Sequence, residues 1–297
     1  MNEPKPIDAM QLAQDAQWLA QRSTNLVLDR LSRGEPVLAL GIRHSRTIDI
    51  VKIAQASGHH AIWVDLEHSA IPLDLATQMC SSALDLGIVP FVRIPEREYG
   101  AIGRLLDGGA LGIIAPRIET VEQARDVAAA CRFPPLGRRS QIGMLPHFGM
   151  QRVAAGVLNR ALNGSVAVQV LIETPTGIDN IEAIAGLDGV DMVSIGTNDL
   201  SAELGVPGDY RHPRVREAHL HAIACCKRAG KCVAIGGIGD VAYVAELVAL
   251  GAAPLLFSGI DGELLRGAAQ QAGRQALQAL QALQALRAGN AAQAQAS

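Results

Sequence analysis

Residues 166–199, VAVQVLIETPTGIDNIEAIAGLDGVDMVSIGTND, contain one complete strand-helix-strand unit. Val166–Ile172 and Met192–Ile195 are short runs rich in β-favouring residues, and each run ends at a Gly or an acidic residue. The residues between them follow a helical pattern. Two strands joined through a helix pair in parallel by a right-handed crossover, so this stretch predicts an α/β fold.

The same unit recurs along the chain. Strands are predicted at Val37–Ile42, Ala61–Asp65, Val89–Ile94, Leu111–Ala115, Val166–Ile172, Met192–Ile195, Val233–Ile235 and Leu255–Phe257. Eight such units close most simply into a (β/α)₈ barrel, for which 297 residues are sufficient. An open dinucleotide-binding sheet is the alternative, but no GxGxxG follows the first strand.

Two segments lie outside the predicted barrel of residues 24–270. Residues 1–23 carry apolar side chains at helical spacing and are expected to form an added helix. Residues 271–297 are rich in Ala and Gln, with Leu277, Leu280, Leu283 and Leu286 three residues apart, and predict a helical tail whose last residues fray. The long connection from Phe133 to Ser165 is expected to be functional or lid-like.

Composition limits the partners. With 26 Lys and Arg against 29 Asp and Glu, the net charge near −3 offers no electrostatic surface for nucleic acid or an anionic membrane. Five cysteines without zinc or CxxC spacing indicate reduced thiols, and a cytoplasmic location is expected. The apolar stretch 241–260 contains Glu246, Gly251 and Pro254, which predicts a helix, a turn and a buried strand rather than a membrane span.

Charged side chains gather where the predicted strands end. They are Asp65, Glu67 and His68 after the second strand, Arg93 after the third, Arg117 after the fourth, Glu173 after the fifth and Asp199 after the sixth. Barrel enzymes build their active sites at this carboxyl-terminal rim. Glu173 and Asp199 follow adjacent strands and could share a hard divalent ion, although a lone acid there also serves as a helix N-cap.

The chain resembles the HpcH/HpaI family of class II pyruvate aldolases across about residues 24–270. The matching elements, in family order, are WVDLEHS, FVRIPE, LLDGGALGIIAP, FPPLGRR, LIETPTGIDNIEAIAGLDGVD, SIGTNDLS and SGID. The resemblance implies an aldolase barrel that uses Mg²⁺, Mn²⁺ or Co²⁺ at Glu173 and Asp199. It also implies a homo-oligomer, a hexamer built as a trimer of dimers with exchanged C-terminal helices.

The resemblance assigns roles to further residues. Arg93 is expected beside the keto oxygen of a 2-oxo acid, with a salt bridge to Glu67 or Glu96 as the alternative. His68 is the expected acid/base, acting through a metal-bound water and oriented by Asp107.

Other residues of the motifs are expected to complete the site. Gly196, Thr197 and Asn198 are expected to bind the substrate carboxylate, while Asp65 and Glu67 support the pocket. Thr197 stands where many members have proline, which predicts a looser turn.

The predicted function is reversible cleavage of a 4-hydroxy-2-oxo acid to pyruvate, or a related 2-oxo acid, and an aldehyde through a metal-stabilised enolate. A macrophomate-synthase-like or oxaloacetate-decarboxylating enzyme and a CoA-ester lyase are alternatives within the same superfamily. A non-catalytic barrel is the alternative from another class. The cluster Gly236-Gly237-Ile238-Gly239 fits either a phosphate site or a tight turn after the seventh strand.

Overall fold

The computed structural model describes Trp18 and residues 24–296, with side chains described up to residue 288. The predicted N-terminal helix therefore lies outside the described residues, apart from Trp18. Within the described part, eight parallel strands form one sheet in the order β7-β6-β5-β4-β3-β2-β1-β8. The strands are β1 (Val37–Ile42), β2 (Ala61–Asp65), β3 (Val89–Arg93), β4 (Gly112–Ala115), β5 (Ala167–Ile172), β6 (Met192–Gly196), β7 (Cys232–Gly236) and β8 (Leu255–Ile260).

The sheet curls into a nearly closed barrel. All seven ladders are parallel, and β8 pairs with β1, while β7 and β8 approach each other without a ladder. Helices alternate with the strands: α2 (Leu26–Ser32), α3 (Asp49–Ala56), α4 (Leu73–Asp85), α5 (Ile102–Asp107), α6 (Val121–Cys131), α7 (Ala155–Ser165), α8 (Pro175–Asp179), α9 (Ile181–Ala185), α10 (Thr197–Glu203), α11 (Pro213–Arg228), α12 (Val241–Ala249) and α13 (Asp261–Ala296), with 3₁₀ turns η1 (Tyr99–Ala101) and η2 (Pro146–Phe148). The predicted barrel is confirmed.

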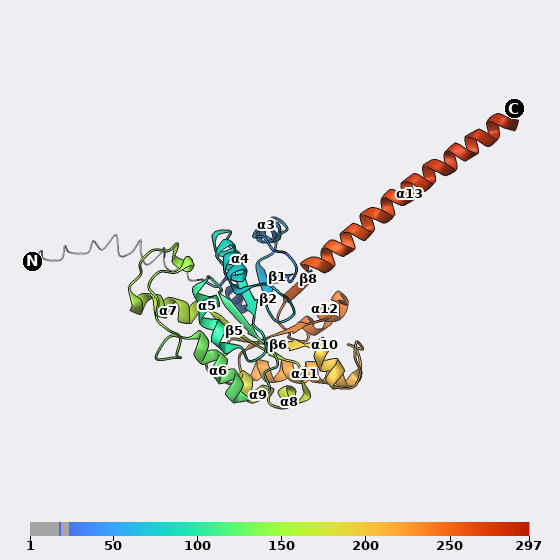
Figure 1. Ribbon diagram of the computed structural model, residues 1–297. Coiled ribbons are helices and arrows are strands. Elements are labelled where there is room, and N and C mark those ends of the chain that lie inside the picture. Colours follow the sequence, from blue (N-terminus) through green and yellow to red (C-terminus); the bar gives the residue numbers. More distant parts are fainter. Residues whose placement is uncertain (1–17, 19–23, 297) are drawn as a thin grey trace, which may run out of the picture.

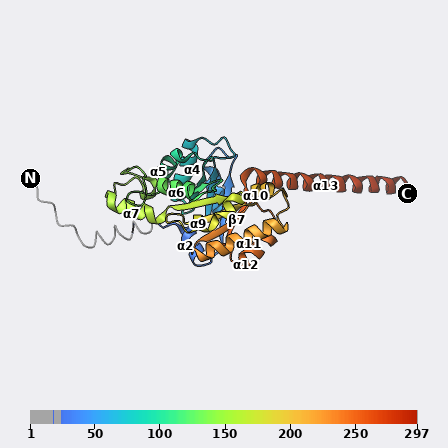
Figure 2. The ribbon, with the colours of Figure 1, turned by 90° about the horizontal axis from the view of Figure 1, so that it is seen from below.

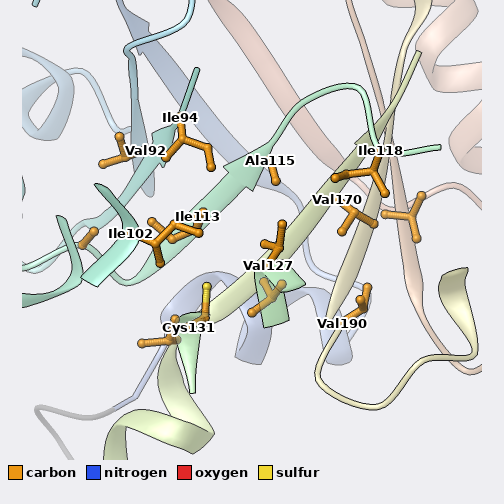
Figure 3. Close-up of a cluster of buried hydrophobic side chains, with 14 of the residues drawn as sticks. Val92, Ile94, Ile102, Ile113, Ala115, Ile118, Val127, Cys131, Val170 and Val190 are labelled. Carbon is orange, nitrogen blue, oxygen red and sulfur yellow. The ribbon is translucent and has the colours of Figure 1, made fainter. Parts of the chain in front are cut away.

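Two apolar cores follow from the period-two alternation of each strand. Inward side chains such as Val37, Phe91 and Met192 fill the barrel. Outward side chains pack against the covering helices, and Figure 3 shows this outer core where β3, β4 and β5 meet α5 and α6. Its labelled members are Val92, Ile94, Ile102, Ile113, Ala115, Ile118, Val127, Cys131, Val170 and Val190.

The apolar stretch 241–260 forms α12, a turn and β8, so the predicted helix, turn and strand are confirmed, but β8 is only partly covered rather than buried. The helices of the described chain include none with the length and hydropathy that a bilayer crossing requires.

The C-terminal helix leaves the barrel. In Figures 1 and 2, α13 projects away from the other helices as one long rod. It begins at Asp261, earlier than the predicted tail, and continues to Ala296, through residues that were expected to fray. The high helix propensity of Ala and Gln, with no proline in the segment, accounts for this continuation.

The long connection after α6 lies at the end of the barrel opposite the predicted site. Arg132 Nη1 donates to the carbonyl oxygen of Val166, which precedes β5, and His147 Nε2 lies 3.1 Å from the carbonyl oxygen of Ala110, which precedes β4. A helix antiparallel to the strands returns the chain to their amino-terminal ends. The connection therefore does not form a lid over the rim of its own barrel, and the expectation that it is functional stays a prediction.

Candidate active site

The top layer of the barrel interior carries the predicted polar residues. Trp63, Phe91 and Leu171 point inward one layer below, so alternation places Asp65, Arg93 and Glu173 inward at the rim. The carboxyl ends of parallel strands meet there. The structure thus brings together residues that are more than 100 positions apart in the sequence.

Asp65 and Arg93 form a buried ion pair. Arg93 donates from Nε to Oδ1 over 3.0 Å and from Nη2 to Oδ2 over 2.8 Å, and Asp65 is fully buried. The guanidinium carbon of Arg93 lies 5.2 Å from the centre of the Trp63 ring. Burial alone raises the pKa of Asp65, but hydrogen bonds from Arg93, the His68 amide and Arg43 outweigh it, and the pKa falls.

Glu67 and His68 follow Asp65 in the loop above the rim. The Asp65 Oδ1 atom accepts from the backbone amides of both residues, which holds the loop in place. Glu67 Oε2 lies 3.1 Å from Arg93 Nη1 and 3.7 Å from His68 Nε2. The side chain of His68 is 56% exposed and therefore accessible to a substrate at the rim.

Glu173 is buried among other acids. Its Oε2 atom accepts from the Arg117 amide over 3.0 Å, and Arg117 has a left-handed φ of 48°, a strained conformation typical of functional sites. Burial, together with Glu67 and Asp199, raises the pKa of Glu173 to about 7, against the Arg117 amide and Arg93. A nearby cation would relieve this penalty.

Gly196 makes room for the Glu173 carboxylate. A Cβ atom at position 196 would stand 2.5 Å from Glu173 Oε1. Any side chain there would displace the carboxylate, so the glycine is required by the close approach of β5 and β6.

The first turn of α10 carries the other predicted residues. Thr197 is buried, whereas Asn198 and Asp199 are exposed at the rim beside Glu173. Asn198 Oδ1 accepts a hydrogen bond from the Tyr210 hydroxyl. Gly237, with φ of 78°, leaves space for Asn198, since its Cβ would stand 3.1 Å from the Asn198 nitrogen. Close packing and a left-handed backbone thus account for Gly237.

Thr197, which stands where many family members have proline, takes part in a buried hydrogen-bond network. Its Oγ1 atom lies 3.1 Å from His219 Nε2, and His219 Nδ1 lies 3.3 Å from the Tyr243 hydroxyl. Burial, with a contribution from Arg216, lowers the pKa of His219 to about 4, so the imidazole is neutral. The hydroxyl therefore anchors α10 to α11 through a buried network that proline could not form.

The predicted pairing of His68 with Asp107 is not formed within the chain. Asp107 is the last residue of α5, at the amino-terminal end of the barrel, and accepts from Arg139 Nη2 over 2.8 Å. The Arg139 side chain is 1% exposed and stacks on Phe133, with 4.4 Å between the guanidinium carbon and the ring centre. Asp107 balances this buried charge because α5 runs antiparallel to the strands.

Three residues at or near the site were not predicted: Arg43, His219 and Asp261. Arg43 directly follows β1, and its Nε donates to Asp65 Oδ2 over 2.8 Å. The rule that selected Arg93, a charge at a strand end, also selects Arg43. Asp261 directly follows β8 at the end of the SGID motif, so the same rule selects it, whereas His219 lies within a helix, where only tertiary contacts reveal a role.

The carboxylates at the rim fit a divalent ion that keeps some coordination positions open for water and substrate. Within the described residues, no group of three or more His, Cys, Asp or Glu side chains is arranged as a complete metal site. Glu173 and Asp199 supply two carboxylates, and Mg²⁺-type ions are commonly held by one or two carboxylates with water and substrate. The raised pKa of Glu173 supports the same conclusion.

The chain matches a known protein family. The family profile described as HpcH/HpaI aldolase/citrate lyase matches residues 44–268. The chain belongs to this family. The resemblance seen in the sequence is confirmed, and with it the expectation of a carbon–carbon lyase.

Relatives in the HpcH/HpaI family cover most of the chain. A 4-hydroxy-4-methyl-2-oxoglutarate aldolase of Chaetomium globosum is 38% identical over 218 residues, 73% of this chain and 81% of the relative. A 2-keto-3-deoxy-L-rhamnonate aldolase of Shigella sonnei is 30% identical over 245 residues, 79% of this chain and 90% of the relative. The crystal structure of an HpcH/HpaI aldolase from Desulfitobacterium hafniense gives a TM-score of 0.78 at 29% identity, covering 83% of this chain and 95% of that one.

Proposed function

We propose that the protein is a divalent-metal-dependent aldolase that reversibly cleaves 4-hydroxy-2-oxo acids to pyruvate, or a related 2-oxo acid, and an aldehyde or ketone. One observation carries the proposal: buried Glu173, with its pKa raised to about 7, lies beside Asp199 at the rim that also holds Arg93. The names of the relatives from Chaetomium globosum and Shigella sonnei support this reaction class.

Glu173 and Asp199 are the residues proposed to hold the ion, with Mg²⁺, Mn²⁺ and Co²⁺ as candidates. A bound ion supplies Lewis acidity to the carboxylate and keto oxygens of a 2-oxo acid. Glu67 lies close enough to raise the pKa of Glu173 but is paired with Arg93, so we assign it a supporting role.

Arg93 is proposed to stabilise the negative charge that develops on the keto oxygen during cleavage. In the reaction, the C4 hydroxyl loses its proton, the C3–C4 bond breaks, and the electron pair stays on the pyruvate half as an enolate. Arg93 is prepared for this because Asp65 fixes the plane of its guanidinium with two hydrogen bonds.

His68 is proposed as the acid/base that exchanges protons with the substrate. Its exposed ring stands on the loop that Asp65 fixes, next to Glu67. The backbone at Gly196, Thr197 and Asn198, at the start of α10, is proposed to bind the substrate carboxylate through its amides.

The alternative reactions of this superfamily differ in what reacts with the enolate. Oxaloacetate decarboxylation and a macrophomate-synthase-like addition use the same donor half, and the former is expected as a side activity. A CoA-ester lyase needs a basic surface beyond the rim for the CoA phosphates, and Arg93 and Arg117 at the rim are instead paired with acids.

Assembly through the C-terminal helix is proposed as well. The four leucines from Leu277 to Leu286 are exposed, and β8, from which α13 departs, is only partly covered. A spacing of three residues turns each leucine by roughly 60° around the helix, so one flat surface cannot cover all four. Exchange of α13 between copies, within a hexamer made as a trimer of dimers, would cover both the leucines and the exposed part of β8.

A cytoplasmic location is proposed from the thiols. All five cysteines are free, and four of them are buried. Reduced cysteines are typical of reducing compartments.

The test is a panel of aldehydes offered with pyruvate and Mn²⁺, with product formation measured against a chelator control. Aldol products that disappear in EDTA and return with added metal support the proposal. Full activity in EDTA, or a lysine adduct trapped by borohydride, would point to Schiff-base chemistry instead.

A further inference from the structure

A cavity of about 610 Å³ extends from the barrel mouth through the gap between β7 and β8. Its inner wall begins at Asn198, next to the proposed ion ligand Asp199, and reaches Arg43 at the end of β1. Its outer part, at Leu256 and Leu264, lies where α13 leaves β8. The inner part is therefore continuous with the proposed site but lies on the side away from Arg93.

Arg43 is held firmly at this wall. Its backbone amide, like that of Ser45, donates to the carboxylate of Asp261, over 3.0 Å and 2.6 Å. Its side-chain Nε donates to Asp65 over 2.8 Å, and the side chain remains 24% exposed. Within the described residues, its terminal nitrogens Nη1 and Nη2 make no hydrogen bond, so two charged donors are left for a ligand.

The lining of the cavity fits a small carbon chain with an anionic end. Among the lining residues that the structure describes, Arg43 and Glu263 are charged, and Arg43 alone carries a positive charge. Trp63, Ile238 and Phe257 supply apolar surface.

Two guanidinium groups thus share one carboxylate. Asp65 separates Arg93, on the side of Glu173, from Arg43, on the side of the β7–β8 gap. A substrate whose keto acid lies at Arg93 and the two carboxylates of the ion site would direct its far end toward Arg43. Planar guanidinium donors recognise a carboxylate specifically.

We infer that Arg43 binds a second carboxylate, on the part of the substrate that leaves as the aldehyde or ketone, so that the enzyme prefers dicarboxylic 4-hydroxy-2-oxo acids. This inference rests on the proposed aldolase function and adds the class of acceptor. The donor half of the reaction does not depend on it.

The experiment compares two substrates that differ only at the far end. Cleavage of 4-hydroxy-2-oxoglutarate yields pyruvate and glyoxylate, and cleavage of 4-hydroxy-2-oxopentanoate yields pyruvate and acetaldehyde. The ratio of their kcat/KM values is measured for the wild type and for Arg43→Gln, Arg43→Lys and Arg46→Gln. Arg46 lies in the same loop, is exposed, and serves as the matched charge control.

The wild type is expected to favour the dicarboxylate, and Arg43→Gln to lower the ratio about 10- to 100-fold, mainly through KM, because a charge-assisted hydrogen bond is lost. Arg43→Lys is expected to recover part of the ratio, and Arg46→Gln to keep it. Exchange of the pyruvate methyl protons, which involves no acceptor, is expected to fall much less than dicarboxylate cleavage.

Three results separate failure of the inference from failure of the function. A wild type that cleaves 4-hydroxy-2-oxopentanoate at least as well as the dicarboxylate overturns the Arg43 assignment and leaves the aldolase intact. Equal losses on both substrates in Arg43→Gln reduce Arg43 to a support for Asp65. A wild type that cleaves neither and exchanges no methyl protons overturns the proposed function itself.

Discussion

The carboxylate of Asp65 meets the guanidinium of Arg93 through two parallel hydrogen bonds, 3.0 Å and 2.8 Å long. The pair lies at the rim of the barrel with Asp65 fully buried. Removing either charged group would therefore leave the other without a partner and destabilise the fold. Arg93 was predicted as a catalytic residue with a salt bridge as the alternative. The salt bridge expected as the alternative is formed with Glu67, whose Oε2 lies 3.1 Å from Arg93 Nη1, whereas the pair with Asp65, which fixes the plane of the guanidinium, was not predicted. The catalytic role of Arg93 stays a prediction.

Asp65→Asn is expected to lower both stability and activity. The amide nitrogen cannot accept from Arg93, and breaking a buried pair typically costs about 3–5 kcal/mol. Denaturant unfolding and aldol cleavage would be measured with Asp49→Asn as the control, whose exposed pair with Lys52 should contribute little to stability. Equal, small effects in both variants would show that the Asp65 pair does not orient the site.

Glu173→Gln and Asp199→Asn are each expected to abolish metal binding and cleavage. In the wild type, metal affinity should rise with pH up to about 7, because Glu173 must lose its proton to bind a cation and burial has raised its pKa to about 7. Below that value the affinity falls roughly tenfold per pH unit for one proton. Calorimetric titration with Mn²⁺ from pH 5.5 to 8 checks this, and a flat profile would contradict it.

His68→Ala is expected to separate proton transfer from binding. Pyruvate should still bind with metal, while cleavage and methyl-proton exchange fall about 10²- to 10⁴-fold through loss of the acid/base. Oxaloacetate decarboxylation should suffer less, because loss of CO₂ creates the enolate without a base. NMR exchange and pyruvate release would be compared with His221→Ala, an exposed histidine on α11. Equal loss of both activities with binding intact would show that His68 is no dedicated proton carrier.

Thr197→Val is expected to destabilise the chain by about 1–3 kcal/mol, since the buried Nε2 atom of His219 is left without a partner. The buried His219 is also expected to make the folded protein less stable in acid. Its pKa is lowered from 6.5 to about 4 in the folded state, so the unfolded chain binds more protons and stability falls as pH drops from 6.5 to 4. His219→Gln should remove part of this dependence in denaturant titrations. An unchanged pH profile would exclude His219 as its source.

The double variant Leu280→Glu with Leu283→Glu is expected to dissociate the proposed assembly, because charges cannot be buried between copies without partners. Light scattering would measure the mass, with Gln278→Glu and Gln281→Glu as the control on the same helix. A wild-type monomer would overturn the proposed assembly. An unaltered mass in the leucine variant would show that α13 does not hold the copies together.

The sequence by itself determined the barrel and the rim. Eight β-rich runs alternating with helical segments predicted the eight parallel strands, with boundaries close to those observed. Since parallel strands all end on one side and side chains alternate along each strand, the ends of β2, β3 and β5 had to carry Asp65, Arg93 and Glu173 into a single site. Local pattern was sufficient because both rules act within one strand.

Only the tertiary structure decided which partners these residues meet. The family resemblance implied a pairing of Asp107 with His68, but within the chain the direction of α5 carries Asp107 to the opposite end of the barrel and to Arg139. Similarly, the hydroxyl of Thr197 finds His219 on another helix. Such hydrogen bonds depend on how separate helices pack on the barrel, and that packing is set by the two apolar cores together rather than by any one segment.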